Sequence, residues 1–216
     1  MAPIESYSPA TVERLSRQAA VVIQRSGLVA IPTETFYGLG ANPFDARAVD
    51  RVRAVKGRED AKAILVLVGS VNDLSSFVED VPPVASMLIE VFWPGPLTIL
   101  FPARPSLPLA LTAGTGLVGI RLSSCRPLCE LLTRVGPLTG TSANRAGEAP
   151  ARTAEAVQQA LGEAVDLILD AGPTPGGLPS TVVQAHDALR IVREGVIARS
   201  VIEATLQQRG FSLKSS

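Results

Sequence analysis

Short, uninterrupted apolar runs restrict the fold of this chain more than any other feature of its sequence. Residues 28–32 (LVAIP) and 63–69 (AILVLVG) are far shorter than the roughly 20 residues that cross a bilayer, and each ends at proline or glycine. An apolar run without polar alternation is typical of a strand buried on both faces. The segment 45–57 between them predicts a helix, so the three segments predict a strand, helix, strand crossover unit.

The remaining segments continue this alternation. A first helix is expected to begin with Ser8 as N-cap and to stop at Gly27. The other expected helices are residues 82–96, 125–136, 153–161 and 200–208, and the other expected strands are 97–102, 117–123, 166–172, 180–185 and 188–195. Together they predict a mixed α/β sheet with helices packed against it, in one domain of residues 1–216 with a frayed end at 213–216.

Composition limits the classes of function. A chain of 216 residues with 46% hydrophobic residues can bury one substantial core. Its 20 basic residues balance 20 acidic ones, which argues against a dedicated nucleic-acid coat, so any anion site must be local. No apolar run approaches a membrane span and no signal peptide precedes the first amphipathic segment, so we expect a cytoplasmic protein without membrane contact.

The cysteines and the single histidine restrict the chemistry further. Cys125 and Cys129 would share one helix face, and nothing nearby supplies two further metal ligands, so buried thiols are favoured over a metal or redox site. His186 falls in a predicted turn between two short strands, where a solvated surface position is favoured over catalysis. We therefore expect a reaction without a histidine base and a chain without its own metal site.

Cations gather where the predicted helix 45–57 ends. Lys56, Arg58 and Lys62 surround the loop that leads into the next buried strand. One interpretation is that they cap the helix and keep the surface soluble, because the helix dipole favours cations at this end. The other is that they converge into a polyphosphate clamp and neutralise a leaving pyrophosphate.

Two polar loops are further candidates. Residues 32–40 (PTETFYGLG) follow the first apolar strand, and Gly38 and Gly40 would let the backbone approach a ligand closely. Residues 138–153 (LTGTSANRAGEAPART) carry short polar side chains and end near an arginine: Thr139, Thr141, Ser142, Asn144 and Arg152. Either loop could be a hydrogen-bonded turn or a ligand loop at a strand end.

Arg121 is the best single anchor candidate. It interrupts the strand 117–123, which otherwise reads as buried, and a buried arginine requires a carboxylate from the protein or from a ligand. Ser180 and Arg193 are weaker candidates, because edge strands often carry such groups. The sequence has no Walker A motif and no G-x-G-x-x-G motif.

Seven segments occur in one order along the chain: IPTETFYGLGANPFD, KGREDAK, FWPGPLTILFPA, VGIRLS, TSANRAGEAP, PSTVV and IVREG. In this order and approximate spacing they resemble the YrdC-type threonylcarbamoyl-AMP synthases, over residues 27–196. Without the additional C-terminal domain of longer members, the chain resembles the short form. The resemblance implies a YrdC/RibB-like twisted α/β sheet with flanking helices and a positively lined concave substrate face.

The resemblance also implies an activity. Such enzymes are nucleotidyltransferases that combine L-threonine, bicarbonate and ATP into threonylcarbamoyl-adenylate and release pyrophosphate. A partner transferase complex then moves the threonylcarbamoyl group to tRNA, which the synthase itself could also contact. The chemistry requires orientation and charge neutralisation more than a protein nucleophile, and Mg²⁺ is expected with ATP.

Matching motif positions imply the site residues. Threonine would be held by Thr35, Arg121, Ser142 and Ser180, with Arg121 on the amino acid or its carbamate. ATP would be held by Lys56, Arg58, Lys62, Asn144, Arg152 and Arg193, with Lys56 and Arg58 as charge stabilisers.

The chain departs from many members of this family at several positions. It has Glu59 and Ala63 in place of prolines, Leu67 and Cys125 near positions of histidines, Ser123 at the proline of R-x-P, and Ala146 for a commoner serine. These departures leave another small amino acid open as substrate. Two other interpretations are a non-catalytic RNA-binding module and a paralogue that adenylates another carbamate.

Overall fold

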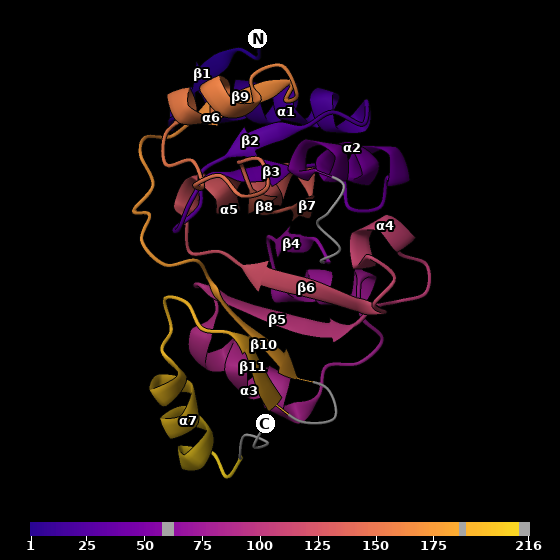
Figure 1. The fold of residues 1–216 in the computed structure, drawn as a ribbon, viewed down its shortest axis with the longest axis vertical. Helices are drawn as coiled ribbons and strands as arrows, with labels where there is room; N and C mark the ends of the chain where they lie inside the picture. Colours follow the sequence, from indigo (N-terminus) through magenta and orange to yellow (C-terminus); the bar gives the residue numbers. More distant parts are fainter. Residues whose placement is uncertain (58–62, 186–188, 212–216) are drawn as a thin grey trace.

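The structure is a computed structural model that describes residues 1–57, 63–185 and 189–211 (Figure 1). Within these residues it confirms the predicted α/β class, with mixed sheets and flanking helices. The prediction of one sheet is wrong, because the strands form two.

The first sheet has five strands and lies in the upper half of Figure 1, with the N-terminus. Its strands are β1 Ile4–Ser6, β2 Val29–Ile31, β3 Gly38–Gly40, β8 Thr141–Ser142 and β9 Leu167–Asp170. The order is β1-β9-β2-β3-β8, in which β9 pairs in parallel with β1 and β2, and β3 pairs antiparallel with β2 and β8.

The second sheet has six strands. They are β4 Leu65–Val68, β5 Leu97–Pro102, β6 Leu117–Leu122, β7 Leu138–Thr139, β10 Thr181–Ala185 and β11 Leu189–Arg193. The order is β11-β10-β5-β6-β4-β7, with parallel pairs β10/β5 and β6/β4. The strands β7 and β8 are separated only by Gly140, so this short segment passes from one sheet to the other.

Helices flank both sheets. They are α1 Val12–Gln24, α2 Ala46–Lys56, α3 Pro83–Phe92, α4 Leu109–Thr112, α5 Arg126–Val135, α6 Ala154–Leu161, α7 Arg199–Gln208 and the 3-10 helix η1 Val71–Ser76. Figure 1 places α1 and α6 beside the five-stranded sheet, and α3 and α7 beside β10 and β11 at the opposite end. No helix in the described part of the chain is long and apolar enough to cross a membrane.

The predicted crossover unit is wrong. The strands β2 and β4 lie in different sheets, although α2 lies between them in the sequence as predicted. The chain turns back after β2 and pairs its glycine-rich segment Gly38–Gly40 antiparallel with β2. The sequence predicts part of a loop for that segment, whereas the structure makes it strand β3, which pairs with β2 and β8 before α2 begins.

The first helix begins later than predicted. Thr11, and not Ser8, precedes it as N-cap, because Ser8 belongs to a turn in which its N–H donates to Thr11 Oγ1 at 2.9 Å. The same hydroxyl donates to Ser6 O at 2.7 Å and so joins the end of β1 to the helix.

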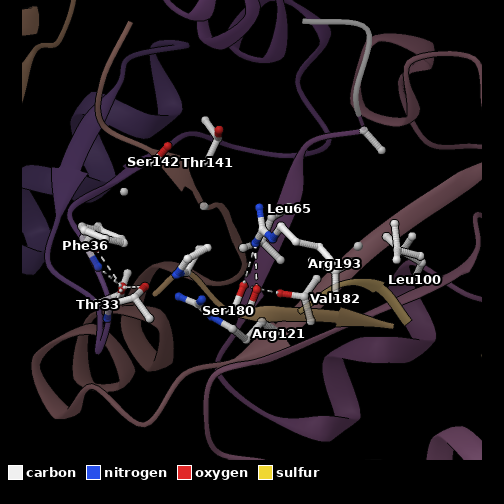
Figure 2. A pocket seen from close by; sticks show the side chains of 18 of the residues that line it. Thr33, Phe36, Leu65, Leu100, Arg121, Thr141, Ser142, Ser180, Val182 and Arg193 are labelled. Atoms are coloured by element: carbon white, nitrogen blue, oxygen red, sulfur yellow. Dashed lines mark hydrogen bonds between the residues drawn. The ribbon is translucent and has the colours of Figure 1, made fainter. Parts of the chain in front are cut away.

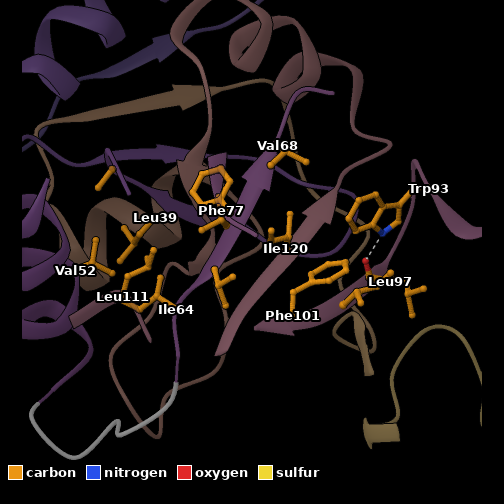
Figure 3. Close-up of a cluster of buried hydrophobic side chains, with 14 of the residues drawn as sticks. Leu39, Val52, Ile64, Val68, Phe77, Trp93, Leu97, Phe101, Leu111 and Ile120 are labelled. Carbon is orange, nitrogen blue, oxygen red and sulfur yellow. Dashed lines mark hydrogen bonds between the residues drawn. The ribbon is translucent and has the colours of Figure 1, made fainter. Parts of the chain in front are cut away.

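One large core lies against both sheets, and Figure 3 shows part of it. Leu39 from β3 and Ile120 from β6 belong to the same cluster, together with Phe77 and Phe101. Trp93 also belongs to this core, and its indole N–H donates to Leu97 O at 2.7 Å. A second cluster packs α1 and α5 on the other side of β2 and β9. Burial on both faces explains why β2 and β9 read as continuous apolar runs.

Candidate functional site

A cavity of about 730 Å³ lies between the two sheets (Figure 2). The five-stranded sheet contributes Gly38, Ser142 and the loop after β2, and the six-stranded sheet contributes residues of β4, β5, β6, β10 and β11. Its volume is typical of small-molecule sites. No Asp or Glu is among the described residues that line it, whereas Lys56, Arg121 and Arg193 are. The cavity is therefore locally positive in a chain of zero formal net charge.

The loop after β2 presents two threonine hydroxyls to this cavity. Thr33 Oγ1 accepts the N–H groups of Thr35 at 3.0 Å and Phe36 at 3.3 Å, and lies 3.0 Å from Thr35 Oγ1. This is a turn closed by a threonine side chain, in which the hydroxyl replaces a backbone acceptor. Both threonines are at most 5% exposed, so the turn holds the Thr35 hydroxyl in a fixed position.

Sheet strands supply the opposite wall. Ser180 Oγ lies 3.0 Å from Thr98 Oγ1 on β5, and Arg193 Nη2 donates to Ser180 O at 2.8 Å. These hydrogen bonds fix Ser180, which directly precedes β10, to the two strands that flank β10, namely β5 and β11. Burial lowers the pKa of Arg193.

Arg121 on β6 is only 3% exposed and lies 3.5 Å, Nε to Oε1, from Glu34 in the loop after β2. The prediction that Arg121 must face a carboxylate is confirmed, with a protein carboxylate as partner. Burial lowers the pKa of the Arg121 guanidinium, and the Glu34 charge opposes that shift. This ion pair connects the loop of one sheet to a strand of the other.

Lys56 reaches the loop that follows β8. Its Nζ donates to Ser142 O at 3.0 Å, to Asn144 O at 2.9 Å and to Asn144 Oδ1 at 3.0 Å. The Asn144 amide in turn donates to Arg145 O and Glu148 O, both at 2.8 Å. Lys56 is the last residue of α2. Its side chain therefore attaches this loop to the end of the helix and also brings a positive charge to the cavity.

One part of the wall is apolar. Leu65, Leu100, Leu117 and Val182 line it together with Gly119. A Cβ at Gly119 would come within 3.1 Å of Leu100 Cδ2, so the glycine leaves room for the Leu100 side chain on this wall.

The cavity brings together six of the ten residues that the sequence singled out: Thr35, Lys56, Arg121, Ser142, Ser180 and Arg193. Two others, Asn144 and Arg152, do not line it. Arg152 is exposed, and its Nε donates to Thr174 O at 3.4 Å. Arg58 and Lys62 lie outside the described residues, as do Glu59 and His186.

The remaining departures fall in different environments. Ala63 lines the cavity, whereas Leu67 is fully buried in the core. Cys125 and Cys129 are predicted to be buried thiols; in the structure both are free but only half-buried. Burial raises the pKa of Cys125 to about 11. Ser123 is fully buried, and its hydroxyl donates to Glu34 Oε2.

Sequence reasoning selected the loop that contains Thr33 and Glu34 but gave a binding role only to Thr35 in it, and it did not select Thr98. The signal for Thr98 was present, because it stands between Leu97 and Ile99 in a strand, and alternation turns its side chain to the other face. No comparable pattern marks Glu34, since its partner Arg121 is 87 residues away in the chain. Among the described residues no three His, Cys, Asp or Glu side chains gather in a group that could hold a metal ion.

Fold and cavity together define an α/β protein in which two mixed sheets enclose a cavity lined by cations and without described carboxylates. Residues 21–195 match the Sua5/YciO/YrdC family, whose description reads "telomere recombination". The chain belongs to this family.

Relatives with assigned names match most of the chain. The putative threonylcarbamoyl-AMP synthase of Mycobacterium tuberculosis H37Rv is 36% identical, covering 94% of this chain and 95% of the relative. The threonylcarbamoyl-AMP synthase of Alkalilimnicola ehrlichii is 38% identical, covering 82% of this chain and 94% of the relative.

Solved structures are similar as well. The crystal structure of Pyrococcus abyssi Sua5 with L-threonine is 30% identical with a TM-score of 0.87, covering 99% of this chain and 62% of Sua5. The chain thus spans less than two thirds of that protein. Escherichia coli YciO is 27% identical with a TM-score of 0.81, covering 91% of this chain and 97% of YciO.

Proposed function

We propose that the chain is a threonylcarbamoyl-AMP synthase, a nucleotidyltransferase that makes threonylcarbamoyl-adenylate and pyrophosphate from L-threonine, bicarbonate and ATP. Relatives that match nearly their full length carry this name, and the similar Sua5 structure contains L-threonine. The product would serve tRNA modification.

One observation carries the proposal: hydroxyls and cations from widely separated segments meet in one cavity. Thr35, Ser142 and Ser180 come from three different loops or strands, and Arg121 from a fourth. The hydroxyls suit the ammonium and hydroxyl of a small amino acid, and the guanidinium suits its carboxylate. These four are the residues proposed to hold threonine.

The reaction needs positioning and charge neutralisation. The amine attacks the carbon of bicarbonate, water leaves, and an oxygen of the resulting carbamate attacks the α-phosphorus of ATP while pyrophosphate departs. Lys56 and Arg193 supply positive charge for the phosphate oxygens, and the buried wall keeps both reactants in one orientation. We propose the same role for the cations Arg58, Lys62 and Arg152, and a hydrogen-bonding contact with ATP for Asn144. Arg58 and Lys62 lie outside the described residues, and Asn144 and Arg152 do not line the cavity.

Mg²⁺ would enter with the nucleotide. Oxygen ligands suit this ion, and the described lining residues include no carboxylate, so phosphate oxygens and water would provide its ligands. The ion would neutralise charge on the triphosphate.

The test is pyrophosphate release from the full chain with ATP, bicarbonate and one amino acid at a time. We expect release that depends on L-threonine and on bicarbonate. Release with another small amino acid, and none with L-threonine, would instead favour a paralogue that adenylates a different carbamate. No amino-acid-dependent release at all would contradict the proposal.

A transferase complex would take the product, and the reaction would take place in the cytoplasm. Direct tRNA contact stays a prediction. A non-catalytic RNA-binding module would show salt-sensitive tRNA affinity that survives loss of ATP binding. The balance of 20 basic and 20 acidic residues argues against that module as the main activity.

A further inference from the structure

Glu34 stands between the two cavity threonines, yet its side chain faces the other sheet. Its Oε1 lies 3.5 Å from Arg121 Nε, and its Oε2 accepts the Ser123 hydroxyl. The carboxylate is only 15% exposed and is not part of the cavity wall. A charge buried behind a binding site needs a reason, because burial disfavours it strongly.

Ser123 holds one side of this carboxylate. It is fully buried and follows Arg121 by two residues, so both side chains leave the same side of the chain. Its hydroxyl donates to Glu34 and accepts the N–H of Cys125 at 3.1 Å. The single proton of the hydroxyl is therefore donated to Glu34, and this hydrogen bond fixes the position of the Oε2 atom of the carboxylate.

The two edges of the Arg121 guanidinium have different surroundings: the Nε edge faces a protein carboxylate, and the edge with the terminal nitrogens does not. Its Nε faces Glu34 Oε1, and both atoms are buried without a hydrogen bond. Arg121 lines the cavity (Figure 2), and its terminal nitrogens Nη1 and Nη2 form no hydrogen bond with any residue in the described part of the chain. A guanidinium binds a carboxylate best as a fork, so the direction of this open edge decides what it can bind.

We propose that Glu34, held by Ser123, is a positioning residue of the amino-acid site: it fixes the Nε edge of Arg121 so that the terminal nitrogens face the cavity and bind the carboxylate of the amino acid. The inference rests on the proposed function and extends it to two residues outside the cavity wall. It also gives the buried Ser123 hydroxyl a defined task, the fixing of the Glu34 carboxylate.

A merely structural role for Glu34 predicts a different pattern. If Glu34 only compensated a buried charge, Glu34→Ala would lower stability and weaken every ligand alike, and Glu34→Gln would be equally harmful because it also removes the charge. If Glu34 orients Arg121, glutamine can keep its one oxygen toward Arg121 Nε and donate its amide N–H to the Ser123 hydroxyl, so it preserves most of the effect.

The experiment is titration calorimetry of the full chain with L-threonine, L-threoninamide and a non-hydrolysable ATP analogue. For Glu34→Ala we expect at least a tenfold rise in Kd for L-threonine, a change of less than twofold for the ATP analogue, and a smaller preference for L-threonine over L-threoninamide. Glu34→Gln should stay within threefold of the unchanged chain. The matched control is Glu130→Gln, because Glu130 pairs with Arg126 at 2.9 Å on the solvent side of α5, and it should change neither Kd.

If Glu34→Ala does not fold, Ser123→Ala is used to test the inference. We expect it to raise the Kd for L-threonine three- to fivefold and to leave the Kd for the ATP analogue unchanged. Unchanged threonine affinity in the variant that folds, or equal losses for both ligands, would overturn the inference. If the unchanged chain binds no L-threonine, the proposed function fails and the inference with it; if it binds L-threonine and Glu34→Ala binds equally well, only the inference fails.

Discussion

At the scale of single residues, the hydroxyl of Thr35 reaches the cavity because Thr33 closes the turn around it. Thr33 Oγ1 accepts two N–H groups of the turn and donates to Phe36 O at 2.8 Å. The two threonines therefore have different tasks: Thr33 shapes the loop, and Thr35 is the residue proposed to touch the amino acid.

Thr35→Val tests this division. Valine keeps the shape of threonine and loses the hydroxyl. We therefore expect a five- to tenfold rise in the KM for L-threonine, which corresponds to the free energy of about one hydrogen bond, and no change in the KM for ATP. Steady-state pyrophosphate release measures both values. An equal rise in both KM values would contradict the assignment of Thr35 to the amino acid.

Cys125 is expected to be unreactive at neutral pH. Burial raises its pKa to about 11, so the fold disfavours the thiolate, and the thiol stays protonated until the pH rises toward that value. In a Cys129→Ser variant we expect slow alkylation by iodoacetamide at pH 8, a rate that climbs between pH 9 and 11, and fast alkylation at pH 8 in denaturant. Fast alkylation of the folded variant at pH 8 would contradict this.

At the scale of elements, Gly140 lets the chain pass between the two sheets. It separates β7 from β8, and its N–H donates to Leu65 O at 2.7 Å. A Cβ at this position would lie 2.4 Å from Leu67 Cγ, and Leu67 is fully buried. The Leu67 side chain thus packs directly on this glycine.

We expect Gly140→Ala to lower the free energy of unfolding by about 1–3 kcal/mol, because the added methyl overlaps a side chain in a packed core. Urea denaturation measures the change. In a double-mutant cycle with Leu67→Ala, the double variant should lose less than the sum of the single variants, since the smaller side chain removes the overlap. Additive losses would show that Leu67 is not the cause.

At the scale of the whole molecule, the cavity exists because two sheets face each other across it. Residues from both sheets line it, and the Glu34–Arg121 pair connects its two sides. A ligand that contacts both walls therefore binds the folded chain and not the unfolded one.

L-threonine should stabilise the fold accordingly. At a concentration 100 times its Kd the gain is about 2.7 kcal/mol, which for a chain of this length raises the Tm by roughly 5–10 °C. Differential scanning fluorimetry measures this, with D-threonine as the control. The absence of any shift specific to the L-enantiomer would argue that the cavity does not bind the amino acid.

The sequence by itself determined the α/β class, most helices and strands, and the residue types of the site. Apolar runs reveal burial, and a buried Arg121 demands a carboxylate wherever the chain supplies one. Only the tertiary structure decided that the strands form two sheets, that Gly38–Gly40 is a strand, and that Glu34 is that carboxylate. The reason is that periodicity reports which faces are buried but not which segments become neighbours, and every wall of this cavity is made by neighbours distant in the chain.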